Sequence, residues 1–125
     1  MKKNLLKLAA GFLLLAPAAS MAHHSFAMFD MQKTVTLKGA VAKFKWQNPH
    51  AWLEVDVPLT GGKSERWAIE MTSPNNLALE GWKRTSLKAG DKVTLYVHPL
   101  RNGAKGGSFQ GVRLATGATL GQVDQ

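Results

Sequence analysis

The chain has 125 residues, 45% of them hydrophobic, and a formal net charge of +8 at neutral pH. It contains no cysteine, which excludes disulfide bonds, thiolate metal sites, redox pairs and cysteine nucleophiles. The positive charge favours solubility and attraction to anionic surfaces, but by itself it identifies no partner. A chain of this length holds one small domain with one core.

The first 22 residues have the pattern of a secretory signal peptide. Lys2, Lys3 and Lys7 supply a positive n-region, and the stretch Leu5–Leu15 is mostly apolar and too short to cross a bilayer as a helix. Small residues then fit the rule for signal peptidase, with Ser20 and Ala22 at the two specified positions. A second site after Ala18 also fits. We expect cleavage after Ala22, and hence a protein of the periplasm or of the medium outside the cell.

The predicted mature chain is short and moderately basic. Removal of 22 of the 125 residues leaves 103, and removal of three of the 16 basic residues leaves 13 against eight acidic ones, a net charge of +5. Because there is no cysteine, there is no site for a lipid, and we expect no membrane anchor.

Strand patterns follow an N-terminal arm at residues 23–32. The first strand, Thr34–Trp46, is long, and its apolar positions change face along its length. Such a change calls for a bulge or bend, for which Gly39 supplies local freedom. Trp52–Val57 alternates cleanly between apolar and polar residues, and Arg66–Met71 is the third strand.

A short helix is expected next. Ser73 is a good N-cap, Pro74 suits the first helical position, and Gly81 suits the position after the helix. Two more strands follow, at Lys92–Val97 and roughly at Phe109–Ala115.

The order of these elements predicts the fold class. Three strands, a helix and two strands, with a long bent first strand, are typical of an all-β, five-stranded OB-like barrel. We expect this barrel over residues 33–120, followed by a C-terminal tail at 121–125. Another small β-barrel or roll is the alternative.

Several segments together resemble a family of small exported bacterial proteins of unknown function. The segments that carry the resemblance are Ala22–Phe26, Asn48–Leu53, Trp67–Glu70, Ser73–Asn75, Gly81–Trp82 with Ser86–Lys88, and His98–Arg101. The resemblance implies export and a compact fold, and it supplies no activity.

The four histidines are the candidate metal ligands: His23, His24, His50 and His98. After cleavage at Ala22, His23 is the first residue and can chelate a metal ion through its α-amine and its imidazole. His50 and His98 lie at the first and last of the loops that flank one face of an OB barrel, and the arm is long enough to reach that face. Nitrogen donors of this kind suit Cu(II) first and Zn(II) second.

Each histidine also has a structural explanation, as a solvated polar residue or as a partner of a loop carbonyl. Met28 and Met31 in the arm suit Cu(I), which prefers thioethers, although packing is the more common role of methionine.

A second candidate surface combines an aromatic ring with basic side chains. Trp52 has the outward phase of the second strand, Lys43 and Lys45 have the outward phase of the first, and Arg101 begins a glycine-rich loop. This surface suits an anionic ligand or a protein partner, while cross-strand charge pairing is its ordinary explanation. Single-stranded nucleic acid, a usual ligand of OB faces, is not expected outside the cell.

No catalytic constellation is visible. The serines lack a nucleophile-elbow motif, and the loop Arg101–Gly107 lacks the spacing of a phosphate-binding loop. We therefore expect a monomeric binding protein rather than an enzyme. Copper or zinc binding is the leading hypothesis, and a metal-free module that uses the aromatic and basic surface is the alternative.

Overall fold

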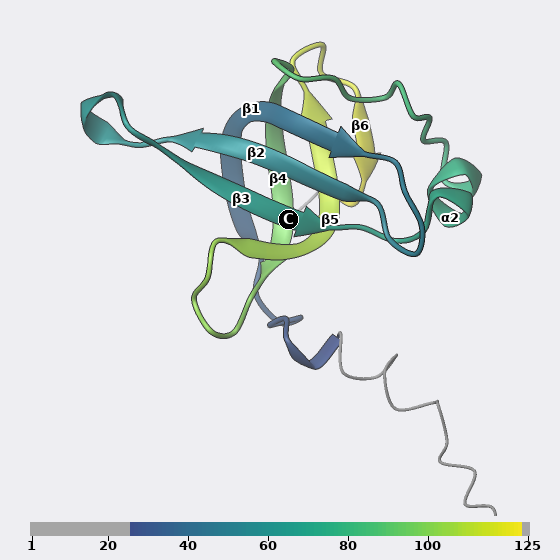
Figure 1. The fold of residues 1–125 in the computed structure, drawn as a ribbon, viewed down its shortest axis with the longest axis horizontal. Helices are drawn as coiled ribbons and strands as arrows, with labels where there is room; N and C mark the ends of the chain where they lie inside the picture. The colour runs from purple at the N-terminus through teal and green to yellow at the C-terminus, as the bar shows by residue number, and fades with distance from the viewer. Residues whose placement is uncertain (1–25, 124–125) are drawn as a thin grey trace, which may run out of the picture.

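The computed structural model describes residues 26–123, which form a curved six-stranded sheet with a short helix beside it (Figure 1). The strands are β1 (Val35–Lys45), β2 (Trp52–Pro58), β3 (Ser64–Glu70), β4 (Lys92–Pro99), β5 (Gly106–Leu114) and β6 (Thr119–Gly121). The helix is α2 (Pro74–Leu79), and a 3₁₀ turn, η1 (Thr60–Gly62), joins β2 to β3.

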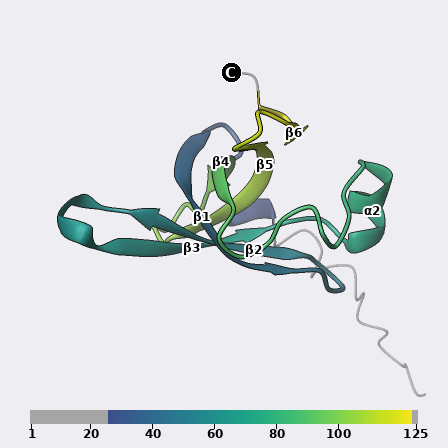
Figure 2. The ribbon, with the colours of Figure 1, turned by 90° about the horizontal axis from the view of Figure 1, so that it is seen from above.

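Five of the strands close into a barrel. The antiparallel neighbours run in the order β3-β2-β1-β4-β5, and Ala68–Glu70 of β3 then pairs in parallel with Gly106–Ser108 of β5. With α2 between β3 and β4, this topology confirms the predicted OB-like barrel. Figure 2 shows that the β2–β3 hairpin continues past the barrel on the side away from α2.

β6 is a strand that the sequence analysis omitted. It follows a turn at Gly117 and pairs with β5, with Leu120 opposite Val112 and Thr119 opposite Arg113. Its last residue, Gly121, lies within the segment expected to be a C-terminal tail. Three residues are too few to show a strand alternation, so local pattern alone does not reveal this element.

The predicted irregularity in the first strand is a β-bulge. Val41 pairs with Val55 and Lys43 pairs with Glu54, so Ala42 is the extra residue. Gly39 has a different role from the one expected, because a Cβ atom there would lie 2.3 Å from the carbonyl oxygen of Asp56. Glycine is therefore needed at this position for the close approach of β1 to β2.

The ends of α2 match the sequence signals. The hydroxyl oxygen of Ser73 accepts a hydrogen bond from the backbone N–H of Asn76, 3.3 Å away, and Pro74 is the first residue of the helix. Gly81, with φ of +91°, follows the helix end. Leu77 is buried in the core, which holds α2 against the barrel. No helix within residues 26–123 is long and apolar enough to cross a membrane.

Aliphatic side chains fill the barrel interior, and aromatic side chains pack against them and enlarge the core. Phe44, Trp82 and Phe109 pack in series, with ring centroids 5.9 Å and 5.3 Å apart. This burial supplies the stability that a chain without disulfides requires. The largest fully buried side chains are Leu53, Val55, Ile69, Leu77, Leu95, Val97 and Val112.

Candidate functional site

A cavity of about 730 Å³ is lined on one side by residues 26–34, which we call the N-terminal segment. Its other sides are formed by the ends of β3 and β4, by β5 and by α2. Its apolar lining includes Phe26 and Met31 of the N-terminal segment and Phe109 of β5. Its size is that of a site for a small molecule. The polar side chains that line it include His50, Glu70, Glu80, His98, Ser108 and Gln110.

The N-terminal segment forms one wall of this cavity. Phe29 is 5% exposed and makes a β-bridge with Leu100 of the β4–β5 loop. The backbone N–H of Asp30 also donates a hydrogen bond to the carbonyl oxygen of Pro99, at 2.8 Å. These contacts hold the wall beside the end of β4.

His50 belongs to the loop between β1 and β2, and its ring is fixed from the end of β3. Nδ1 of His50 lies 2.8 Å from the carbonyl oxygen of Met71 and 3.6 Å from a carboxylate oxygen of Glu70. The next residue, Ala51, exchanges backbone hydrogen bonds with Met71 and Thr72, which keeps the loop on the end of β3.

His98 lies near the end of β4, and its ring is fixed from the N-terminal segment. Its Nδ1 atom lies 2.8 Å from the carbonyl oxygen of Lys33. A carbonyl oxygen only accepts, so Nδ1 of His50 and of His98 must each carry the proton and donate it. In a neutral ring, Nε2 then presents a lone pair, which is the arrangement found in metal-bound histidines.

Strand register connects the two histidines. His98 lies opposite Ser108, and Ser108 lies opposite Glu70. Residues directly opposite one another on neighbouring strands point to the same face of a sheet. His98, Ser108 and Glu70 therefore form a row across three strands, and His50 contacts the Glu70 end of that row.

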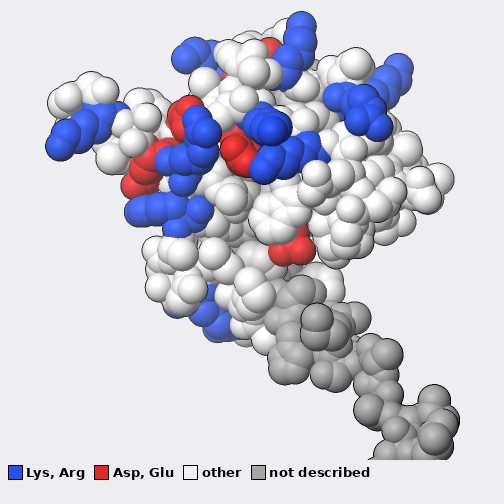
Figure 3. All heavy atoms as spheres, in the orientation of Figure 1, with Lys and Arg blue, Asp and Glu red and all other residues white. Residues whose placement is uncertain are grey.

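The charges around the cavity favour a cation. Among the described residues, its lining contains two carboxylates, Glu70 and Glu80, and no lysine or arginine. Figure 3 shows basic side chains over much of the β1–β2–β3 side of the molecule and above α2, whereas the surface below α2 is mostly uncharged. A cleft that carries only negative charge in a basic protein attracts positive ligands.

The predicted metal ligands fall partly within the described residues. His50 and His98 line the same cavity, and Met31 lines it too, whereas Met28 does not. His23 and His24 lie outside the described residues. Within residues 26–123, no group of three or more His, Cys, Asp or Glu side chains is placed to hold a metal ion.

The aromatic and basic surface has its charges largely paired. Trp52 is half-buried and lies opposite Lys45, whose ammonium contacts the carboxylate of Glu54. Lys43 is exposed and lies opposite Glu54 on the same face. Arg101 is in the β4–β5 loop, with its guanidinium 3.9 Å from Asp30. Cross-strand charge pairing, which is the ordinary explanation for such a surface, therefore accounts for Lys45.

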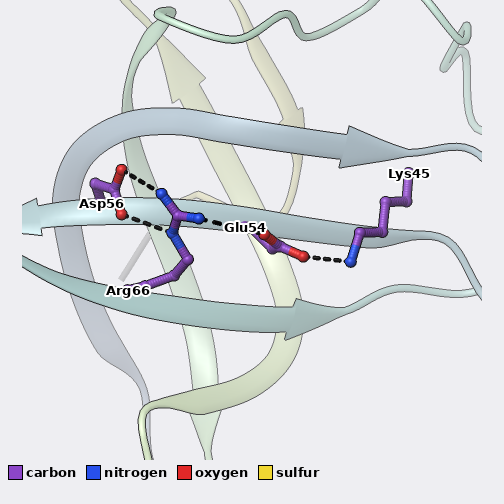
Figure 4. Close-up of polar contacts among 4 residues, drawn as sticks. All are labelled: Lys45, Glu54, Asp56 and Arg66. Atoms are coloured by element: carbon purple, nitrogen blue, oxygen red, sulfur yellow. Dashed lines mark hydrogen bonds and ion pairs between the residues drawn. The ribbon is translucent and has the colours of Figure 1, made fainter.

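A ladder of charges runs across β1, β2 and β3, as Figure 4 shows. Arg66 donates hydrogen bonds from Nε and from a terminal nitrogen to the two carboxylate oxygens of Asp56, each at 2.8 Å. These bonds lower the pKa of Asp56, and the hydrogen bond from Lys45 lowers the pKa of Glu54. We call Lys45, Glu54, Asp56 and Arg66 the charge ladder.

The charge ladder predicts a loss of stability in acid. A carboxyl group whose pKa is lower in the folded state stabilises the fold above its unfolded pKa, about 4, and loses this contribution as pH falls through the folded value. The melting temperature should therefore drop between pH 6 and pH 3, and the drop should be smaller in Asp56→Asn. Thermal unfolding followed by circular dichroism measures both. About 1 M salt should shrink the difference between the two proteins, because exposed ion pairs are screened. Equal drops at low salt would contradict the prediction.

The closed barrel, the bulged first strand and the helix between β3 and β4 define a small OB-fold protein. A crystal structure of the mitochondrial single-stranded DNA binding protein Rim1 of S. cerevisiae matches with a TM-score of 0.51 and 9% sequence identity, covering 66% of this chain and 93% of that chain. A likeness at this identity establishes the fold alone.

Residues 11–110 match the model of a family of unknown function, DUF6152, and the chain belongs to this family. This result confirms the resemblance to a family of unknown function. A search of curated proteins finds no match.

The sequence analysis missed Glu70, Glu80 and Ser108 as cavity residues. Glu70 ends a segment that carried the family resemblance, Trp67–Glu70, and its phase is opposite to that of Trp67 and Ile69, which is typical of any surface position on a strand. Its neighbourhood with Ser108 comes from the parallel β3–β5 pairing, which joins segments that are distant in the sequence.

Proposed function

We propose that this protein is an exported binding protein that holds copper or zinc at the cavity. In this proposal the signal peptide is cleaved after Ala22, and the metal is chelated by the α-amine and imidazole of His23. His24, His50 and His98 are the further candidate ligands. The protein then works in the periplasm or outside the cell.

The observation that carries the proposal is the arrangement of His50 and His98. Both line one cavity, and both have Nδ1 held by a main-chain carbonyl, at 2.8 Å in each case. A histidine fixed in this way offers Nε2 as a ligand and loses little freedom when it binds a metal. Among the described residues, the two carboxylates of the lining and its lack of lysine and arginine add a favourable field for a cation.

The covalent chain supports a role for the N-terminal histidines. Phe26 lines the cavity, and His24 and His23 precede it by two and three residues. Because consecutive Cα atoms are 3.8 Å apart, these two residues are within about 8 and 11 Å of the Cα atom of Phe26. The pair of described histidines falls short of a complete ligand set, and the N-terminal nitrogens would complete it.

Copper is the favoured metal. The donors are imidazole nitrogens and an amine, for which Cu(II) has the higher intrinsic affinity, and Zn(II) accepts the same donors in a tetrahedral site. Met31 also lines the cavity and offers a thioether to Cu(I).

The alternative proposal is a metal-free module that binds an anionic ligand or a protein partner through Trp52, Lys43, Lys45 and Arg101. It has less support, because Lys45 is paired with Glu54 and Arg101 lies beside Asp30. In the presence of a chelator, quenching of tryptophan fluorescence by a ligand, abolished in Trp52→Ala, would favour it over the metal proposal.

The test of the metal proposal is native mass spectrometry and copper titration of the protein, exported with its own signal and purified without a tag. We expect a mass that begins at His23 with one metal ion. His50→Ala and His98→Ala should each weaken binding by about tenfold or more, as loss of one ligand does.

Ser108→Ala is the matched control, because Ser108 lines the same cavity without being a proposed ligand. It should keep the wild-type affinity, and circular dichroism should show that all three variants remain folded. Wild-type affinity in both histidine variants, or a protein that begins at His23 and stays metal-free after copper loading, would refute the proposal.

A further inference from the structure

A second groove, of about 560 Å³, lies over β1, β4 and β5 and shares no residue with the cavity. Three basic side chains, Lys38, Lys92 and Arg113, line it, together with one acidic side chain, Asp56. We call this the basic groove. Its charge is opposite in sign to that of the cavity, so the two sites suit different ligands.

Strand register places the three cations around one hydroxyl group. Lys38 of β1 lies opposite Thr94 of β4, and Thr94 lies opposite Arg113 of β5. Neighbouring strands are about 4.8 Å apart, so the backbones of Lys38 and Arg113 are about 10 Å apart with Thr94 between them. Lys92 is two residues before Thr94, about 7 Å along the same face. These long side chains can therefore meet over Thr94.

Among the described residues, the three cations have no carboxylate partner. Within residues 26–123, no carboxylate oxygen lies within 4.0 Å of the side-chain nitrogens of Lys38, Lys92 or Arg113, whereas Lys33, Lys45, Arg66, Arg101 and Lys105 all have such a partner. Asp56, which shares the groove, is held by Arg66 through two hydrogen bonds of 2.8 Å. The positive potential of the groove is thus left for an external anion.

The apolar residues of the groove lie on both faces of the sheet. Ala40 lies opposite Lys92 on the face of the three cations, whereas Val93 and Leu114 lie opposite each other on the other face and pack in or against the core. A groove of this volume is the size of a small-molecule site.

We propose that the basic groove binds a small phosphorylated molecule with at least two negative charges. Arg113 supplies a planar pair of donors for two oxygens of one phosphate, while Lys38 and Lys92 act as point charges and Thr94 as a hydroxyl donor. This proposal is independent of the metal site, because none of its residues lines the cavity.

Inorganic pyrophosphate is the probe, added to the ¹⁵N-labelled protein with a chelator present to remove metal ions. Its binding should shift the amide signals of Thr94 and its neighbours across the sheet. Lys38→Gln with Arg113→Gln should weaken binding by about tenfold or more, since charge-assisted hydrogen bonds are lost. Arg113→Lys should weaken it by a smaller factor, because the charge remains and the paired donors do not.

The control is Lys83→Gln with Lys88→Gln, which removes two charges that line neither the basic groove nor the cavity. This variant should bind pyrophosphate within about twofold of wild type, as expected for screened distant charges. Equal losses in the two double variants would attribute binding to overall charge and overturn the proposal. The absence of shifts around Thr94, or binding of an oligonucleotide or anionic vesicles that pyrophosphate does not displace, would also overturn it.

Discussion

A chain that begins at His23 is expected to bind Cu(II) at least about a hundredfold more tightly than one that begins at Ala19. In the first chain the α-amine and the imidazole belong to the same residue and close one chelate ring. In the second chain four residues, Ala19–Ala22, separate them, so the amine must be brought to the metal through a flexible loop. The two starts correspond to the two cleavage sites predicted from the sequence.

Competition against a chromophoric chelator measures this difference, with both chains released from a cleavable N-terminal fusion. His50→Ala and His98→Ala, made in both chains, serve as the internal control. They should weaken copper binding in each, because these histidines belong to the cavity whichever residue begins the chain. Equal affinities of the two parent chains would exclude the N-terminal chelate and leave the cavity histidines to be tested alone.

Gly39→Ala should lower the free energy of unfolding by about 3 kcal/mol, the upper part of the range for overpacking. The new Cβ atom would lie 2.3 Å from the carbonyl oxygen of Asp56, and a backbone atom within a paired strand cannot turn aside as a side chain can. A small domain is stable by only about 5–15 kcal/mol, so this is a large share of its stability.

Urea denaturation followed by tryptophan fluorescence measures the loss. Thr36→Ala is the control, because Thr36 is exposed on the same strand and its replacement should change stability by less than about 0.5 kcal/mol. If Gly39→Ala lost no more stability than Thr36→Ala, β1 and β2 would not be in close contact at Asp56.

The local features of the fold were predictable from the sequence. The change of apolar phase between Val41 and Phe44 indicated the bulge, and Ser73 and Gly81 marked both ends of α2. Such features depend on residues within one turn or one strand of each other. The order of these elements along the chain was then enough to indicate the OB topology.

The cavity was less predictable, because its parts come from segments that are far apart in the sequence. The row of His98, Ser108 and Glu70 exists only because β3 pairs with β5, and no periodicity encodes that pairing. The wall at Phe29 depends likewise on a bridge to Leu100, 71 residues later. The sequence predicted that His50 and His98 lie on loops that flank one face. It did not predict that a main-chain carbonyl oxygen holds Nδ1 of each ring.

The cavity has its N-terminal wall only while the N-terminal segment is packed against the barrel. Its ties to the barrel include the N–H of Asp30 on the carbonyl of Pro99, and the ring of His98 on the carbonyl of Lys33. A terminal segment generally opens more readily than a barrel core does. When it opens, the cavity loses Phe26, Phe29 and Met31 together. A ligand that contacts this wall binds only the packed state of the segment, so binding should increase the protection of these amides from solvent exchange.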